Sequence, residues 1–148
     1  MVISRRQILM LSVGASVAAI TGLPAYASVD EANALIDAFT GGAEVQQGKL
    51  TLVLPDVAEN GNTVPLTVSV DSAMDGDDLV ESILVVADGN PRPDIATFHF
   101  SALSAAATAT TRVRLAQSQT LTAIARMKDG TFHAQSTEVT VTVGGCTG

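Results

Sequence analysis

The most reactive side chain in this chain of 148 residues is its single cysteine, Cys146, the third residue from the C-terminus. A cysteine thiolate is a strong nucleophile and can form covalent bonds to sulfur. One cysteine excludes an intramolecular disulfide, and together with His99 and His133 it supplies too few, too scattered ligands for structural zinc. The remaining candidate chemistry is that of a single thiol near the C-terminus.

The tail itself is short and slim. An alternating, strand-like segment over 138–143 runs directly into Gly144-Gly145-Cys146-Thr147-Gly148. Glycine loses more entropy on ordering than any other residue, so we expect Gly144 and Gly145 to form a hinge with little reason to dock on the domain. At about 3.6 Å per residue, five residues reach roughly 18 Å. The sequence therefore predicts a flexible C-terminal carrier arm over residues 144–148, with Thr147 and Gly148 as its tip.

The surroundings of Cys146 in the sequence do not activate it. No Lys, Arg or His lies between Gln135 and the end, and the terminal carboxylate is two residues away. A negative neighbour disfavours the thiolate. We therefore predict a non-catalytic handle that visiting enzymes modify. The alternatives are a cysteine without a role, one that links chains by an intermolecular disulfide, or an autonomous thiol enzyme with a depressed thiol pKa.

Other candidate groups indicate no site, and we expect no cofactor and no metal. His99 is expected on a strand as a facing or interface side chain, and His133 is expected at the surface. The calcium-like group consists of Asp75, Asp77 and Asp78 around Gly76. It lacks the EF-hand spacing and terminal Glu, which favours a solvated acidic loop. No glycine-rich phosphate loop and no nucleophile elbow is found.

The first 27 residues have the features of an export signal. Arg5 and Arg6 precede an uncharged apolar run over 8–20, and Ala25-Tyr26-Ala27 offers a cleavage site. That run is shorter than the roughly 18 residues that span a bilayer, which disfavours a permanent anchor. The order Ser4 to Leu9 resembles the twin-arginine export motif, with an ordinary secretory signal as the alternative. Both predict an exported, periplasmic protein.

Charge and composition narrow the possible partners. Fifteen acidic and eight basic residues give a formal charge of −7, and loss of Arg5 and Arg6 with the signal makes it −9. This is the wrong sign for binding nucleic acid or an anionic membrane surface. Hydrophobic residues make up 47% and charged residues 16%, so the mature chain is expected to fold around a core.

The elements that position the tail are predicted to be almost entirely β. Helical signals cover 28–40 and end at Gly41-Gly42. From Lys49 onward the hydrophobic period is two, and turn residues at 59–62, 88–93 and 128–131 separate the segments, with Asp129-Gly130 typical of a hairpin. Pro65 indicates an edge strand or the start of a strand. The expected strands are 50–54, 64–70, 79–87, 95–100, 111–115, 120–127 and 138–143.

We therefore predict an all-β domain over 28–143, an immunoglobulin-like two-sheet antiparallel β-sandwich with a short N-terminal helix. A barrel shares the pattern and is the alternative.

Several stretches resemble the SoxY family of sulfur-carrier subunits over essentially the whole mature chain. They are 59–65, 87–91, 96–100, 111–116 and 143–146. The family tail ends Gly-Gly-Cys-Gly-Gly, and in this chain Thr147 replaces the glycine after Cys146, which places a β-branched side chain beside the sulfur.

The resemblance implies a carrier of the periplasmic thiosulfate-oxidising system. Cys146 would receive thiosulfate as a cysteine S-thiosulfonate through a c-type cytochrome. A hydrolase would then release sulfate, and a dehydrogenase would oxidise the remaining sulfane sulfur. It also implies a heterodimer with a SoxZ-like subunit, the SoxYZ complex, exported by the twin-arginine route as a folded pair.

Overall fold

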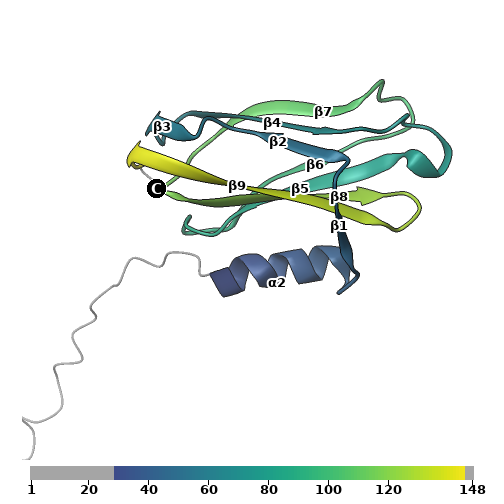
Figure 1. Cartoon of the computed structure of the whole chain (residues 1–148), viewed down its shortest axis with the longest axis horizontal. Coiled ribbons are helices and arrows are strands. Elements are labelled where there is room, and N and C mark those ends of the chain that lie inside the picture. Colours follow the sequence, from purple (N-terminus) through teal and green to yellow (C-terminus); the bar gives the residue numbers. More distant parts are fainter. Residues whose placement is uncertain (1–28, 146–148) are drawn as a thin grey trace, which may run out of the picture.

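The computed structural model describes residues 29–145, so the predicted signal peptide and Cys146, Thr147 and Gly148 lie outside the described residues. Figure 1 shows two stacked sheets with one helix beneath them. The elements are α2 (Val29–Thr40), β1 (Val45–Gln47), β2 (Leu50–Val53), β3 (Val57–Asn60), β4 (Val64–Val70), a 3-10 turn η1 (Gly76–Asp78), β5 (Val80–Ala87), β6 (Asp94–His99), β7 (Ala107–Val113), β8 (Gln119–Met127) and β9 (Phe132–Val143).

The two sheets form the predicted sandwich. The larger has the order β1-β9-β8-β5-β6, with β3 also paired to β9, and the smaller has the order β2-β4-β7. All seven predicted strands are present, and their pairings with one another are antiparallel. The short strands β1 and β3 were not predicted, and both pair parallel with β9. The all-β, immunoglobulin-like sandwich with an N-terminal helix is therefore confirmed.

Strand β4 shows how the alternating sequence pattern places hydrophobic side chains in the core. Its residues alternate between buried and more exposed positions along the whole strand, and Leu66 and Val68 are fully buried. It is the central strand of its sheet, so the edge-strand interpretation of Pro65 is wrong and the strand-start interpretation holds. Strand β2 pairs only with 67–70, so no neighbouring carbonyl on that side requires an N–H from Pro65.

Helix α2 covers the outer face of the larger sheet. Leu35, Ile36 and Phe39 pack on a second buried cluster that includes Ile124 and Phe132. The Arg126 guanidinium lies 4.5 Å from the centre of the Phe39 ring and donates to the Phe39 carbonyl. The helix ends at Thr40, as predicted, and Gly41 follows it with a φ of +66° that favours glycine.

No helix within residues 29–145 is long and apolar enough to cross a membrane.

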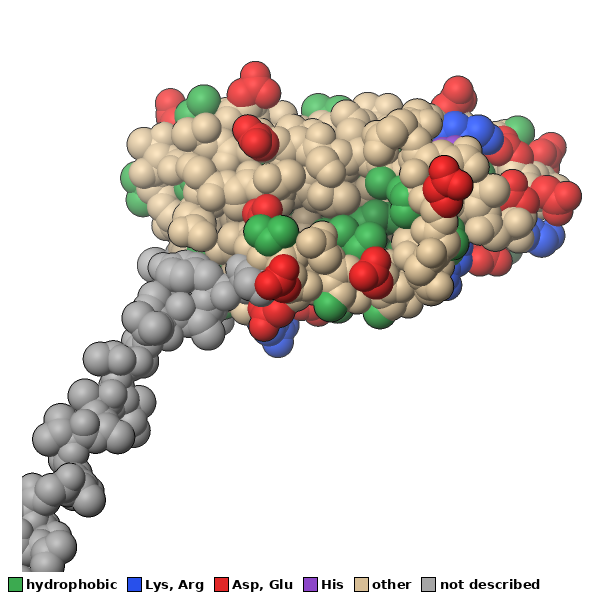
Figure 2. Space-filling view, turned by 60° about the horizontal axis from the view of Figure 1, so that its bottom comes forward, with side chains coloured by type: hydrophobic (Ala, Val, Ile, Leu, Met, Phe, Trp, Pro, Cys, Tyr) green, Lys and Arg blue, Asp and Glu red, His purple; other side chains and the backbone are tan. Residues whose placement is uncertain are grey.

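Acidic side chains occur over the face shown in Figure 2 and gather at the end opposite the C-terminus, where β4 connects to β5. Asp78 in this connection accepts from Lys49 Nζ at 2.7 Å and from the Ala73 amide at 2.8 Å. No three or more His, Cys, Asp or Glu side chains within 29–145 are grouped so as to hold a metal ion.

The two histidines differ in environment. His99 is exposed on the edge strand β6. His133 is only 6% exposed, so its predicted surface position is wrong. It lies on β9 between Gln46 of β1 and Ala125 of β8, and burial follows because the unpredicted strand β1 covers that edge of the sheet.

The Lys49–Asp78 pair predicts a small acid sensitivity. The hydrogen bond from Lys49 lowers the pKa of Asp78. A carboxyl whose folded pKa lies below its unfolded value of about 3.9 stabilises the fold above that pH, and the contribution is lost as pH falls through the folded pKa. We expect the Tm of the wild type to fall more than that of Asp78→Asn between about pH 5 and pH 2. Thermal melts of both, with the exposed neighbour Asp77→Asn as control, test this, and equal slopes for wild type and Asp78→Asn would contradict it.

Candidate functional site

One end of the sandwich brings together segments that are far apart in the sequence. The β3–β4 turn, the β5–β6 turn, the β7–β8 loop and the end of β9 meet there, beside the described C-terminal end (Figure 1). Four of the five stretches that carry the family resemblance belong to these segments, and the fifth, 96–100, lies on and just after β6. This convergence defines the candidate site, which we call the arm base.

Three backbone hydrogen bonds hold the arm base together. The Gly61 amide donates to the Val143 carbonyl at 2.8 Å, and the Leu115 amide donates to the Gly61 carbonyl at 2.8 Å. The Gly145 amide then donates to the Leu115 carbonyl at 2.8 Å. The chain is therefore fixed in position up to the residue before Cys146.

Glycine is required here because the backbones approach closely. A Cβ on Gly61 would lie 2.2 Å from the Leu115 oxygen and 2.6 Å from the Gly145 nitrogen. A Cβ on Gly144 would lie 2.2 Å from the Ala116 oxygen. Gly145 is buried. The expectation that Gly144 and Gly145 have little reason to dock is therefore wrong, because the missing side chains allow contact with the domain.

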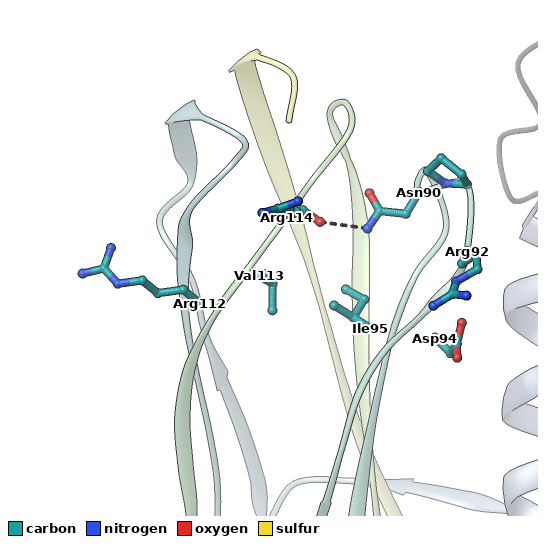
Figure 3. A pocket seen from close by; sticks show the side chains of 8 residues that line it. Asn90, Arg92, Asp94, Ile95, Arg112, Val113 and Arg114 are labelled. Carbon is teal, nitrogen blue, oxygen red and sulfur yellow. Dashed lines mark hydrogen bonds between the residues drawn. The ribbon is translucent and has the colours of Figure 1, made fainter. Parts of the chain in front are cut away.

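The buried side-chain amide of Asn90 forms hydrogen bonds with the residues on both sides of Leu115. Asn90 is 7% exposed, and its Nδ2 donates to the Arg114 carbonyl at 2.8 Å (Figure 3). Its Oδ1 accepts from the Ala116 amide at 2.9 Å and from Gln119 Nε2 at 2.9 Å. Leaving such buried groups without partners costs about 1–3 kcal/mol each, so Asn90 fixes the loop that receives the arm.

Sequence reasoning missed the roles of Gly61, Asn90, Leu115 and Gln119. Gly61 and Asn90 were identified only as turn residues, and nothing local marks Leu115 or Gln119. Their presence in or beside the stretches of family resemblance was the available signal.

A cleft of about 600 Å³ lies beside the arm base, between the β5–β6 turn and the end of β7. Asn90, Arg92, Asp94 and Arg114 line it, with Ile95 and Val113 as its apolar part. Cys146, Thr147 and Gly148 lie outside the described residues, so the site is described up to one residue before the thiol.

A family model described as sulfur oxidation protein SoxY matches residues 36–146. The chain belongs to the SoxY family. The matched range ends on Cys146 and includes every residue of the arm base named above. The resemblance of the sequence to the SoxY family is therefore confirmed.

Solved structures agree on the fold. The sulfur carrier protein SoxY from Chlorobium limicola f thiosulfatophilum aligns with a TM-score of 0.64 and 24% identity, covering 78% of this chain and all of that one. A superoxide reductase (neelaredoxin) from Ignicoccus hospitalis aligns with a TM-score of 0.55 and 17% identity, covering 64% of this chain and 80% of its own. These likenesses concern the fold alone. A search of curated proteins finds no match.

Proposed function

We propose that the chain is a sulfur carrier of periplasmic thiosulfate oxidation and that sulfur intermediates are attached covalently to Cys146. The observation that carries the proposal is the arm base, which holds the chain as far as Gly145. The one cysteine of the sequence is the next residue. The family match supports it, because the match extends to Cys146.

The chemistry requires only a thiol from this chain. Oxidative coupling of the Cys146 thiolate with thiosulfate forms one S–S bond, gives a cysteine S-thiosulfonate and passes two electrons to the c-type cytochrome. Water then cleaves the S–SO₃ bond of the adduct, a different bond from the one formed by coupling. This step yields sulfate, two protons and a cysteine persulfide anion, which the dehydrogenase oxidises. The cytochrome and the hydrolase that carry out these two steps are separate proteins, and this chain is a non-catalytic subunit.

Carriage also requires the arm to leave the domain. A backbone hydrogen bond contributes about 1 kcal/mol net, and a single bond ties Gly145 to Leu115. Release at that bond is therefore easily reversible. Gly144 and Gly145 then act as the hinge, and Thr147 and Gly148 accompany the cysteine into partner pockets.

The partners and compartment belong to the same proposal. Residues 1–27 direct export by the twin-arginine route, and a SoxZ-like subunit joins the folded chain in a SoxYZ heterodimer. The acidic balance of the mature chain suits neither nucleic acid nor an anionic membrane surface.

Mass spectrometry of the native protein tests the proposal. Periplasmic protein from thiosulfate-fed cells is expected to carry a thiosulfonate or sulfane adduct on the peptide 129–148, which trypsin releases after Lys128 and which holds the thiol. Co-purifying chains identify the partner in the same sample. An unmodified thiol during active turnover would contradict the proposal, and a disulfide-linked dimer on non-reducing electrophoresis would favour an interaction module instead.

A further inference from the structure

The acceptor of the Gly145 amide is held in place by hydrogen bonds from several directions. Leu115 donates to the Gly61 carbonyl and accepts from the Gly145 amide, both at 2.8 Å. The Asn90 side chain donates to the carbonyl of the residue before Leu115 at 2.8 Å and accepts from the amide of the residue after it at 2.9 Å. The direction of the Leu115 carbonyl therefore depends on the position of Asn90.

A second buried amide, Gln119, fixes Asn90 in turn. Its Nε2 donates to Asn90 Oδ1 at 2.9 Å and to the Gln117 carbonyl at 3.0 Å. Its Oε1 accepts from the Gly89 amide at 2.8 Å. A side-chain amide has two N–H donors, and both of those on Gln119 are used. Backbone groups that only donate or only accept thus set the orientation of both amides, and neither amide can turn over without placing like groups against each other.

The β5–β6 turn that carries Asn90 borders a cleft on each side. The cleft beside the arm base lies between this turn and the end of β7, and a second cleft of about 510 Å³ lies between the turn and α2. Pro91 and Arg92 line both clefts. The clefts leave the turn space to move, and the two buried amides connect its inner side to the loop that holds the arm.

We propose that Asn90 and Gln119 are positioning residues that set how often the arm leaves the domain. This inference rests on the proposed function, because a carrier has to hold its arm and also release it. While the two amides keep their hydrogen bonds, the Leu115 carbonyl is directed at the Gly145 amide. When the β5–β6 turn moves away, the carbonyl loses that direction and Gly145 is released.

Amide hydrogen exchange of the mature protein, in its native complex, measures this release without any sulfur chemistry. Gln119→Glu keeps the shape of the side chain but replaces its donor with an oxygen, which then faces Asn90 Oδ1 and the Gln117 carbonyl. We expect the protection of the Gly145 amide to fall about tenfold, because buried groups lose their partners. The side-chain NH₂ signals of Asn90 should shift in the same variant. The amide of Ile83, buried in the interior strand β5, should lose less protection.

Gln117→Glu is the matched control. It makes the same change of charge and shape two residues away, on an exposed side chain of the same loop. Protection of Gly145 is expected to stay at the wild-type value. Equal losses at Gly145 in Gln117→Glu and Gln119→Glu would show an effect of charge alone and overturn the proposal. Equal losses at Gly145 and Ile83 in Gln119→Glu would also overturn it, since the whole domain would then be destabilised.

A pair of uncharged variants tests whether the two amides act as one unit. Since Gln119 acts through Asn90, the double variant of Asn90→Ala and Gln119→Met should lose about as much protection at Gly145 as Asn90→Ala alone. Losses that add would show independent roles and contradict the mechanism. Exchange at Gly145 does not depend on sulfur loading, so a failure here is distinct from an unmodified thiol in thiosulfate-fed cells.

Discussion

Cys146→Ser is expected to abolish sulfur loading completely while leaving the fold intact. A serine hydroxyl keeps the shape of the side chain, but at neutral pH it forms no anion able to attack or couple with thiosulfate. Because position 146 follows the described domain, we expect a change in unfolding free energy within about 0.5 kcal/mol. Intact mass after thiosulfate feeding measures the adduct, and thermal unfolding measures the fold.

The matched control for this variant is its neighbour, Thr147. Thr147→Gly restores the glycine of the family tail and keeps the thiol, so adducts on Cys146 are expected to persist. Faster loading in Thr147→Gly would show that the β-branched side chain hinders entry into partner pockets, and an unchanged rate would show that it does not. Adducts of unchanged mass in Cys146→Ser would place the cargo elsewhere on the chain.

Gly61→Ala is expected to produce the largest structural effect at the arm base. The added methyl would lie 2.2 Å from the Leu115 oxygen, so the backbone of the turn or the loop has to shift. Forced overpacking of this kind costs about 1–3 kcal/mol. Each kcal/mol lowers the Tm of a domain of this size by about 4 °C. The shift also breaks the Gly145 hydrogen bond, so hydrogen exchange at the Gly145 amide should accelerate.

Gly76→Ala is the matched control for this prediction. It lies at the opposite end of the sandwich with a φ of +51°, and a Cβ there meets nothing within 4 Å. It is expected to cost about 1 kcal/mol through backbone strain alone. Exchange at Gly145 should remain slow. Equal exchange at Gly145 in wild type and Gly61→Ala would show that the turn does not hold the arm.

The secondary structure was predictable where it depends on local pattern. The helix was found from its apolar spacing, its acidic first turn and the glycines that follow it. Seven strands were found from their period of two, and the hairpin from Asp129-Gly130. The strands β1 and β3 were missed because three or four residues show no periodicity, and they exist through pairing with β9.

The errors share one physical cause. The burial of His133 depends on β1, the central position of β4 depends on the order of strands, and the docking of Gly145 depends on Leu115 and Gly61. Each is a contact between segments distant along the chain, and no local propensity reports it.

The sequence by itself determined a single thiol near the C-terminus, an acidic composition and a resemblance to the SoxY family, and it predicted an export signal ahead of a β domain. These properties depend on residue identity and order alone. The tertiary structure decided that Gly144 and Gly145 contact the domain and that Asn90 holds the loop beside them. It also decided that arginines of the β5–β6 turn and of the end of β7 line one cleft beside the arm base. Such positions depend on which loops share one end of the sandwich, and strand pairing over long sequence distances sets that arrangement.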